Sequence, residues 1–298
     1  MVRVFKRIVC ILFFALSFLF SSDNYWQQSV NYKMNVILID SVRQLACSSI
    51  ITYKNNSPDE LNEIYLHLYP NAFQLGSVKT RDYLNGYGSN SRASYFRDEL
   101  DGYQSKIHVR EFTIAKDQNI VIDDYKINDT VLRANLKSAI LPGEEVRIDI
   151  KWNHHVGGMV ERAGYYEGQY NMAQWYPKIA VYDDGGWHAE PFHAQGEFYG
   201  EFGRFDVEFE LPEKFIIGAS GVVESGDPGW EMVRVDTSAD FDDWFSLFEE
   251  DYKEPELTKN RKVRFVAENV HDFAWVASPN FLYEHDIYDG IDVHVLYN

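Results

Sequence analysis

A mainly β fold is predicted from three features of the sequence. Aromatic residues make up 16% of the chain, with 20 Tyr and 20 Phe, and such side chains favour half-buried sheet surfaces. Apolar and polar residues alternate with a period of two over long stretches, which is typical of strands with one buried face. Clusters of Asn, Asp, Ser, Pro and Gly separate these stretches, as turns do.

The first alternating stretches predict strands throughout residues 32–69. Residues 55–59, Asn-Asn-Ser-Pro-Asp, interrupt them with turn chemistry at the spacing of a hairpin. Residues 141–144, Leu-Pro-Gly-Glu, form a second such turn ahead of an alternating strand at residues 146–152. Further strands are expected at residues 107–114, 120–122, 132–136, 205–211, 215–219, 263–267 and 291–296.

Two polar stretches interrupt the strands. Residues 74–103 are rich in Gly, Ser, Asn, Arg and Tyr and predict a long excursion with a short helix near residues 94–100. Residues 236–256 carry nine acidic residues and one Lys. They lack the Asp-x-Asp-x-Asp-Gly spacing of a calcium loop, so we interpret them as a solvated loop.

Residues 1–22 have the composition of an export signal. Arg3, Lys6 and Arg7 form a basic start, residues 8–20 are an apolar run, and Ser21 and Ser22 are small. The run is short for a membrane span, which needs about 20 apolar residues. We therefore expect an exported protein, periplasmic or extracellular, that contacts the membrane only through this segment if it stays uncleaved.

Charge and cysteine content narrow the classes of function. The formal net charge is −18, with 28 basic and 46 acidic residues, which argues against nucleic acid as a partner. Removal of the signal with its three basic residues would make it −21. Cys10 lies in the apolar run, so the mature chain keeps only Cys47, a predicted core residue, and forms no internal disulfide.

The usual catalytic motifs are absent from the sequence. None of the nine histidines is followed by Glu, so there is no His-Glu-x-x-His zinc helix. His188 and His193 are five residues apart, and Pro191 between them forbids a regular helix. His154 and His155 would point to opposite faces of a strand. We therefore predict no catalytic residue and no metal ligand within the chain.

A series of segments resembles the amino-terminal domain of M1 family zinc metallopeptidases, in the form of the bacterial members. Residues 171–184, which contain Gln174-Trp175-Tyr176-Pro177-Lys178, are similar to the Gln-aromatic-x-Pro segment of that family. Other similar segments keep the family's order, at residues 66–72, 141–143, 197–203, 205–207, 211–212, 218–221 and 269–275. The resemblance covers nearly the whole chain after the signal.

This resemblance implies a large curved β-sandwich or saddle that packs against a thermolysin-like catalytic domain. It divides the chain into a signal at residues 1–22, the β-domain at 23–288, and a last strand or the start of the catalytic domain at 289–298. The family's zinc ligands and its Gly-x-Met-Glu strand would lie in that further domain. Gly157-Gly158-Met159-Val160 is no substitute, because Val160 stands where Glu is required. We therefore interpret the chain as a fragment that is inactive alone.

The resemblance implies a substrate-binding role for two residues, Gln174 and Tyr176. In M1 aminopeptidases, a Gln or Glu two residues after the Gln of this segment helps to hold the substrate's free amine. Here that position is Tyr176, whose phenol cannot replace the charge of a carboxylate, and Gln174 offers an amide oxygen instead. The open alternative is that Gln174 and Tyr176 simply brace the sheet.

The resemblance predicts part of an aminopeptidase that removes residues from peptide amino termini, with zinc in the full-length parent. Its partners would be peptide substrates and its own catalytic domain. Two alternatives stay open. One is a secreted β-sandwich module that binds a saccharide or a peptide, and the other is a peptidase-like scaffold without zinc.

Overall fold

Three layered sheets and two hairpins make up the computed structural model, which describes residues 25–86, 104–158, 161–234 and 259–298. The fold is mainly β, as predicted. The predicted signal, the helix near residues 94–100, the acidic loop at 236–256, and Met159 with Val160 fall wholly or largely outside these ranges. No helix within the described ranges is both long enough and apolar enough to cross a membrane.

The largest sheet has eight strands in the order β16-β17-β14-β1-β2-β8-β4-β5. All its neighbouring strands are antiparallel except β1 and β14, which run parallel with Val30 opposite Gly203. Its strands are β1 (Ser29–Ile39), β2 (Gln44–Lys54), β4 (Lys106–Lys116), β5 (Asn119–Ile120), β8 (Glu145–His155), β14 (Gly203–Pro212), β16 (Val222–Gly226) and β17 (Asn260–Val270).

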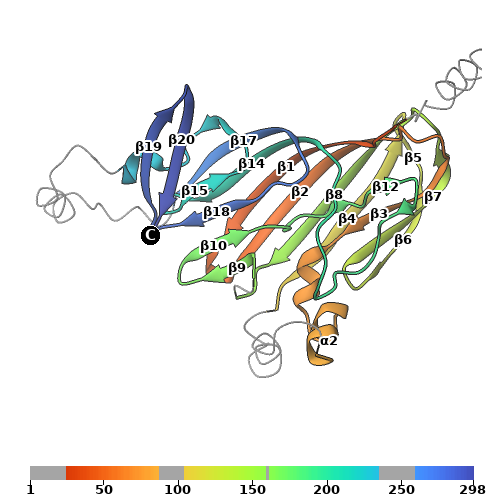
Figure 1. Ribbon diagram of the computed structural model, residues 1–298, viewed down its shortest axis with the longest axis horizontal. Helices are drawn as coiled ribbons and strands as arrows, with labels where there is room; N and C mark the ends of the chain where they lie inside the picture. The colour runs from red at the N-terminus through yellow and green to blue at the C-terminus, as the bar shows by residue number, and fades with distance from the viewer. Residues whose placement is uncertain (1–24, 87–103, 159–160, 235–258) are drawn as a thin grey trace, which may run out of the picture.

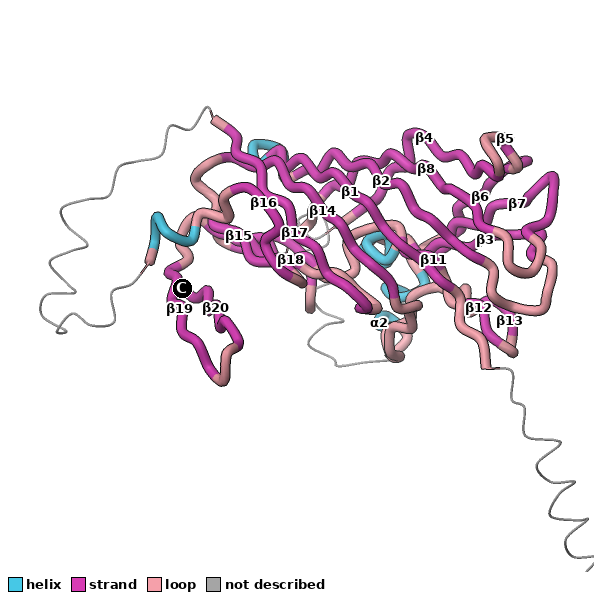
Figure 2. Tube along the Cα trace, turned by 90° about the horizontal axis from the view of Figure 1, so that it is seen from above, coloured by secondary structure: helices cyan, strands magenta, loops and turns pink. Residues whose placement is uncertain are grey.

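Two four-stranded sheets cover one face of the large sheet, one toward each end (Figures 1 and 2). The first has the order β15-β18-β10-β9, from β9 (Ala163–Tyr166), β10 (Gln169–Met172), β15 (Ile216–Ala219) and β18 (Trp275–Ser278). The second has the order β11-β3-β7-β6, from β3 (Leu61–His67), β6 (Ile122–Asn128), β7 (Val131–Ile140) and β11 (Lys178–Ile179).

Short elements complete the fold. The two hairpins pair β12 (Tyr182–Asp183) with β13 (Gly186–Trp187) and β19 (Leu282–Tyr288) with β20 (Ile291–Tyr297). The second hairpin projects from one end of the layered sheets (Figures 1 and 2). The described helical turns are η1 (Asp40–Val42), η2 (Tyr69–Phe73), α2 (Val78–Leu84) and η3 (Trp230–Val233), so no long helix occurs among them.

The alternating pattern places one continuous core between the sheets. Along β1 every second residue from Val30 to Leu38 is buried, and β8 and β14 alternate in the same way. Residues of one strand two positions apart share a face, so the apolar set of each strand points inward. Cys47 belongs to this core, as predicted, and burial raises the pKa of its thiol well above the usual value.

The turn at residues 55–59 joins two different sheets, so its hairpin-like spacing is misleading. β2 lies in the large sheet and β3 in a small one. The Asn55 side chain donates to the carbonyl oxygens of Asp59 and Ile140 and accepts from Ser57. Buried backbone carbonyls need such partners. The 55–59 turn therefore closes a corner between layers, held by the Asn55 side chain.

Candidate functional site

The chain turns sharply at Gln174, between β10 and β11. Gln174 has φ +55°, in the left-handed region that few non-glycine residues adopt. In an extended strand, residues two apart such as Gln174 and Tyr176 would lie on one face. The structure has a turn there, and this turn brings both side chains to the same carboxylate.

That carboxylate belongs to Asp272, in the loop between β17 and β18. The Tyr176 hydroxyl donates to Asp272 Oδ1 at 2.9 Å, and Gln174 Nε2 donates to Oδ2. Trp175 Nε1 donates to the carbonyl oxygen of Phe273 at 3.0 Å. Three consecutive side chains thus bind two consecutive residues that lie almost a hundred positions away. We call this arrangement the Asp272 clip.

The clip is largely buried. Trp175 and Tyr176 have no exposed surface, and the Asp272 side chain is 19% exposed. Burial, followed by the charge of Asp272, raises the pKa of the Tyr176 phenol well above its usual value, so the hydroxyl stays a donor at neutral pH. In the clip, the side chains of Gln174 and Tyr176 therefore donate their hydrogen bonds to Asp272, another residue of the same chain.

Lys178 adds a buried cation beside the clip. Its Nζ lies 3.8 Å from Asp272 Oδ1, too far for a hydrogen bond, and its side chain is 3% exposed. Burial lowers the pKa of this amine, and the Asp272 carboxylate opposes that shift. A Cβ at Gly200 would lie 2.7 Å from Lys178 Nζ and 2.8 Å from the backbone carbonyl oxygen of His271, so glycine fits this position without displacing backbone.

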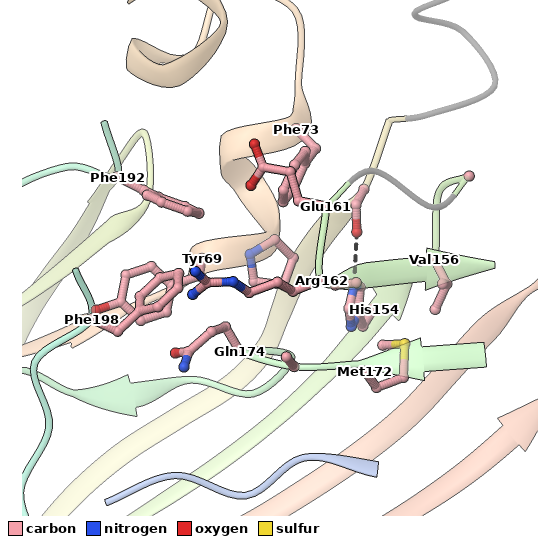
Figure 3. Close-up of a pocket in the computed structure, with 16 residues that line it drawn as sticks. Tyr69, Phe73, His154, Val156, Glu161, Arg162, Met172, Gln174, Phe192 and Phe198 are labelled. Atoms are coloured by element: carbon pink, nitrogen blue, oxygen red, sulfur yellow. Dashed lines mark hydrogen bonds between the residues drawn. The ribbon is translucent and has the colours of Figure 1, made fainter. Parts of the chain in front are cut away.

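A narrow hollow, partly open to solvent, lies next to the clip (Figure 3). Aromatic and small side chains line most of it, and Gln174 links it to the clip. Its lining residues include Tyr69, Phe73, His154, Glu161, Arg162, Met172, Gln174, Phe192 and Phe198. Apolar walls with a few polar groups are the usual composition of a small-molecule site.

One side of the hollow is held by a buried ion pair. Lys79 Nζ lies 2.6 Å from Glu161 Oε2, and the Tyr83 hydroxyl donates to Glu161 Oε1 at 2.6 Å. The same ammonium lies 3.9 Å from the ring centroid of Phe192, within cation–π range. Because Lys79 is 1% exposed, this contact ties α2 firmly to the wall of the hollow.

The two histidines of the 188–193 segment do not share a partner. His188 pairs with Asp183 at 2.8 Å, and His193 pairs with Asp82 at 2.8 Å. His154 is buried and His155 is exposed at the end of β8, as their alternation predicted. Within the described ranges, no group of three or more His, Cys, Asp or Glu side chains could hold a metal ion.

Sequence reasoning missed Asp272 and Arg162 as members of this region. Asp272 lies in the segment 269–275 that carried the family resemblance, but nothing in its spacing indicated a bond to Gln174 and Tyr176. Arg162 follows residues 157–160, which were considered only for a Glu at Val160. No feature of the sequence sets Arg162 apart from the other arginines of the chain.

Comparisons with known proteins match the chain only through solved structures. No family model and no curated protein matches the sequence. An M1 zinc metallopeptidase from Deinococcus radiodurans, a mutant bound to a Tyr-Ser-Ala substrate, has a TM-score of 0.45 and 11% identity over 90% of this chain. A two-domain M1 zinc metallopeptidase mutant bound to L-tryptophan has a TM-score of 0.45 and 10% identity over 91% of this chain. The chain spans 46% and 47% of these two proteins.

Proposed function

We propose that this chain is the amino-terminal, substrate-cleft domain of an exported M1-like zinc metalloaminopeptidase. In this proposal the zinc ion and the water that it activates belong to a catalytic domain outside these 298 residues. The substrates are peptides, which the whole protein shortens from the amino terminus. The chain itself supplies a wall of the cleft and binds no zinc.

The Asp272 clip is the observation that carries the proposal. Its two halves are the segments 171–184 and 269–275, which independently carried the family resemblance. They are far apart in sequence, yet in the structure each supplies half of one buried arrangement beside a hollow. A joint structural role explains why the two segments occur together in one chain.

Asp272 also supplies the negative charge that Gln174 and Tyr176 lack. A carboxylate can accept about four hydrogen bonds, and Asp272 accepts three, from Gln174, Tyr176 and its neighbour Phe273. In this proposal the remaining position accepts from a substrate ammonium, beside the Lys178 ammonium that lies 3.8 Å from Oδ1, and a bond between two ionised groups is roughly twice as strong as a neutral one. In this role Gln174 and Tyr176 are positioning residues, and Asp272 holds the amine.

The test is to express the full coding sequence that contains this chain and to measure bound zinc and aminopeptidase activity. We expect about one zinc per protein and faster cleavage of free than of amino-acetylated peptides. Asp272→Asn should reduce that preference about tenfold, which is the loss of one charge-assisted bond. A full-length product without zinc or peptidase activity would refute the proposal.

Tyr170→Phe is the matched control. The Tyr170 hydroxyl donates to Asp40 at 2.8 Å, so this change also removes a bond between a buried tyrosine and an aspartate. It leaves Asp272 untouched. Tyr176→Phe should alter the preference for free amino termini, whereas Tyr170→Phe should alter stability alone.

The half-buried rings of Phe192 and Phe198 favour a second candidate, a secreted module that binds a ligand without catalysis. Exposed aromatic faces of this kind bind peptides and saccharides by stacking. A full-length protein that lacks zinc and yet binds such a ligand would favour this candidate.

Sequencing the amino terminus of the secreted protein tests export, with cleavage expected near residue 22.

A further inference from the structure

A cleft separate from the hollow opens between α2, the start of β4 and the turn that joins β6 to β7. Its volume is about 410 Å³, and ligand sites usually have volumes of about 300–1,000 Å³, so a small molecule has room there. Leu75 and Ile127, which line the cleft, are 69% and 42% exposed, and Asn128 beside them adds an exposed amide. The cleft therefore offers apolar contact and polar groups together.

Two cations line the cleft from different elements. Arg81 lies on α2, and Lys106 is the first residue of β4. Both residues are exposed, and no ion pair between described residues includes either of them. Arg81 Nη1 donates to the carbonyl oxygen of Gly76 at 2.9 Å, and since a guanidinium has five N–H donors, most of them remain for a ligand.

The carboxylate in the lining of the cleft is committed to the fold. Asp129 Oδ2 accepts from the backbone N–H of Val78 at 2.7 Å, in the first turn of α2. Asp129 Oδ1 is buried, and neither oxygen pairs with Arg81 or Lys106. Two cations and one carboxylate leave the lining with a formal charge of +1, in a chain whose formal net charge is −18.

Further cations adjoin the cleft on the exposed face of the large sheet. Lys106 lies opposite His155 in the register of β4 and β8, and both are exposed. His108 and Arg110 follow on β4 and are exposed as well. Burial lowers the pKa of His108, and the charges of its three basic neighbours lower it further. Glu111, the next residue of β4, already forms an ion pair with a lysine of β8, so the positive charge of the cleft continues along this end of β4.

We propose that the cleft binds the phosphate group of an organic phosphate. A phosphate monoester carries about 1.5–2 negative charges at neutral pH, so it can engage both Arg81 and Lys106, whereas a carboxylate carries one charge. The planar guanidinium suits two-point binding of phosphate oxygens, and the ammonium adds a point charge. The carbon skeleton of the ligand packs against Leu75 and Ile127, which line the same cleft. The site goes beyond the proposed function, since it shares no residue with the Asp272 clip and its positive charge would repel a free amino terminus.

The experiment is an NMR titration of the purified chain with glycerol 3-phosphate at low salt. We expect saturable shifts with roughly millimolar affinity, as suits so small a ligand. Acetate has a single charge and glycerol has none, so both should bind about tenfold more weakly or worse. Sedimentation with vesicles of phosphatidylcholine, with and without phosphatidic acid, distinguishes two sources of the phosphate group. Sedimentation that requires phosphatidic acid assigns the site to a lipid headgroup, and binding of glycerol 3-phosphate alone assigns it to a soluble phosphate.

Variants separate this site from general charge effects. Arg81→Gln and Lys106→Gln should each weaken binding of the phosphate ligand about tenfold. Both side chains are exposed, so neither change opens the core, and thermal unfolding of each variant checks this. Lys54→Gln is the control, because Lys54 is also an exposed lysine at a strand end, but it lies opposite Glu145, at the other end of β8 from His155. It should leave binding unchanged.

Three results would each overturn the proposal. The first is that neither glycerol 3-phosphate nor vesicles with phosphatidic acid bind better than their controls. The second is that acetate binds at least as tightly as glycerol 3-phosphate. The third is that Lys54→Gln weakens binding as much as Lys106→Gln does. Zinc content and peptidase activity of the full-length protein do not depend on any of these results, so the two proposals fail separately.

Discussion

Replacing Asp272 with Ala should destabilise the protein far more than the loss of an ordinary surface charge. The change leaves the Tyr176 hydroxyl, Gln174 Nε2 and the Phe273 N–H without their acceptor, and it leaves Lys178 without its nearby anion. An unsatisfied buried donor costs about 1–3 kcal/mol. Water can reach part of the site, because the Asp272 side chain is 19% exposed. We therefore expect a loss of about 3–4 kcal/mol in the free energy of unfolding.

The assay is urea unfolding at pH 7, followed by tryptophan fluorescence and extrapolated linearly to water. Trp175 lies in the clip and reports on it directly. Asp149→Ala is the control, because Asp149 pairs with Arg147 on the exposed face of β8, with side chains 43% and 54% exposed. An exposed pair contributes about 0–1 kcal/mol. If Asp272→Ala costs no more than Asp149→Ala, the clip does not hold the two segments together.

Two further predictions concern pH. Burial lowers the pKa of His67 to about 4. Below pH of about 6.5, His67 therefore binds a proton in the unfolded chain but stays neutral in the folded protein. The free energy of unfolding falls as the pH drops toward 4. His67→Gln, which can still donate to the carbonyl oxygen of His188, should reduce that acid-induced loss by about 3 kcal/mol in unfolding measured at pH 4 and 7. Burial raises the pKa of Glu201 to about 7, so this carboxyl group costs stability as the pH rises from about 4.5, and the cost is complete above pH of about 7. Glu201→Gln should be more stable than the parent by about 2 kcal/mol at pH 8, with the difference gone below pH of about 4.5; equal stability at pH 8 would contradict the assignment.

Strands with one buried face were predictable from the sequence. β1, β8 and β14 alternate strictly, and their buried residues are the ones that the pattern indicated. β6 was not predicted along its length, because most of its side chains are exposed and polar and carry no alternation. Local patterns report which face of a strand is buried and nothing about its neighbours.

The alternation of apolar and polar residues could not predict contacts between distant segments. The division into three sheets depends on corners such as the one at Asn55, where a local turn signal is the same as that of a hairpin. The pairing of Gln174 and Tyr176 with Asp272 depends on a left-handed residue at Gln174, which no propensity would suggest for glutamine. The candidate site was therefore located by resemblance and completed only by the structure.

The parallel pairing of β1 with β14 has a consequence for how the chain folds. β1 lies between β2, which follows at once, and β14, and the bond from Arg204 to Asn31 joins residues 173 positions apart. Contacts so distant in sequence slow folding, because a large loop must close before they form. A growing chain keeps one edge of β1 unpaired until residues 203–212 have been synthesised. During that interval the exposed edge can pair with other chains, so we expect folding yield to depend strongly on protein concentration and on chaperones that cover strand edges.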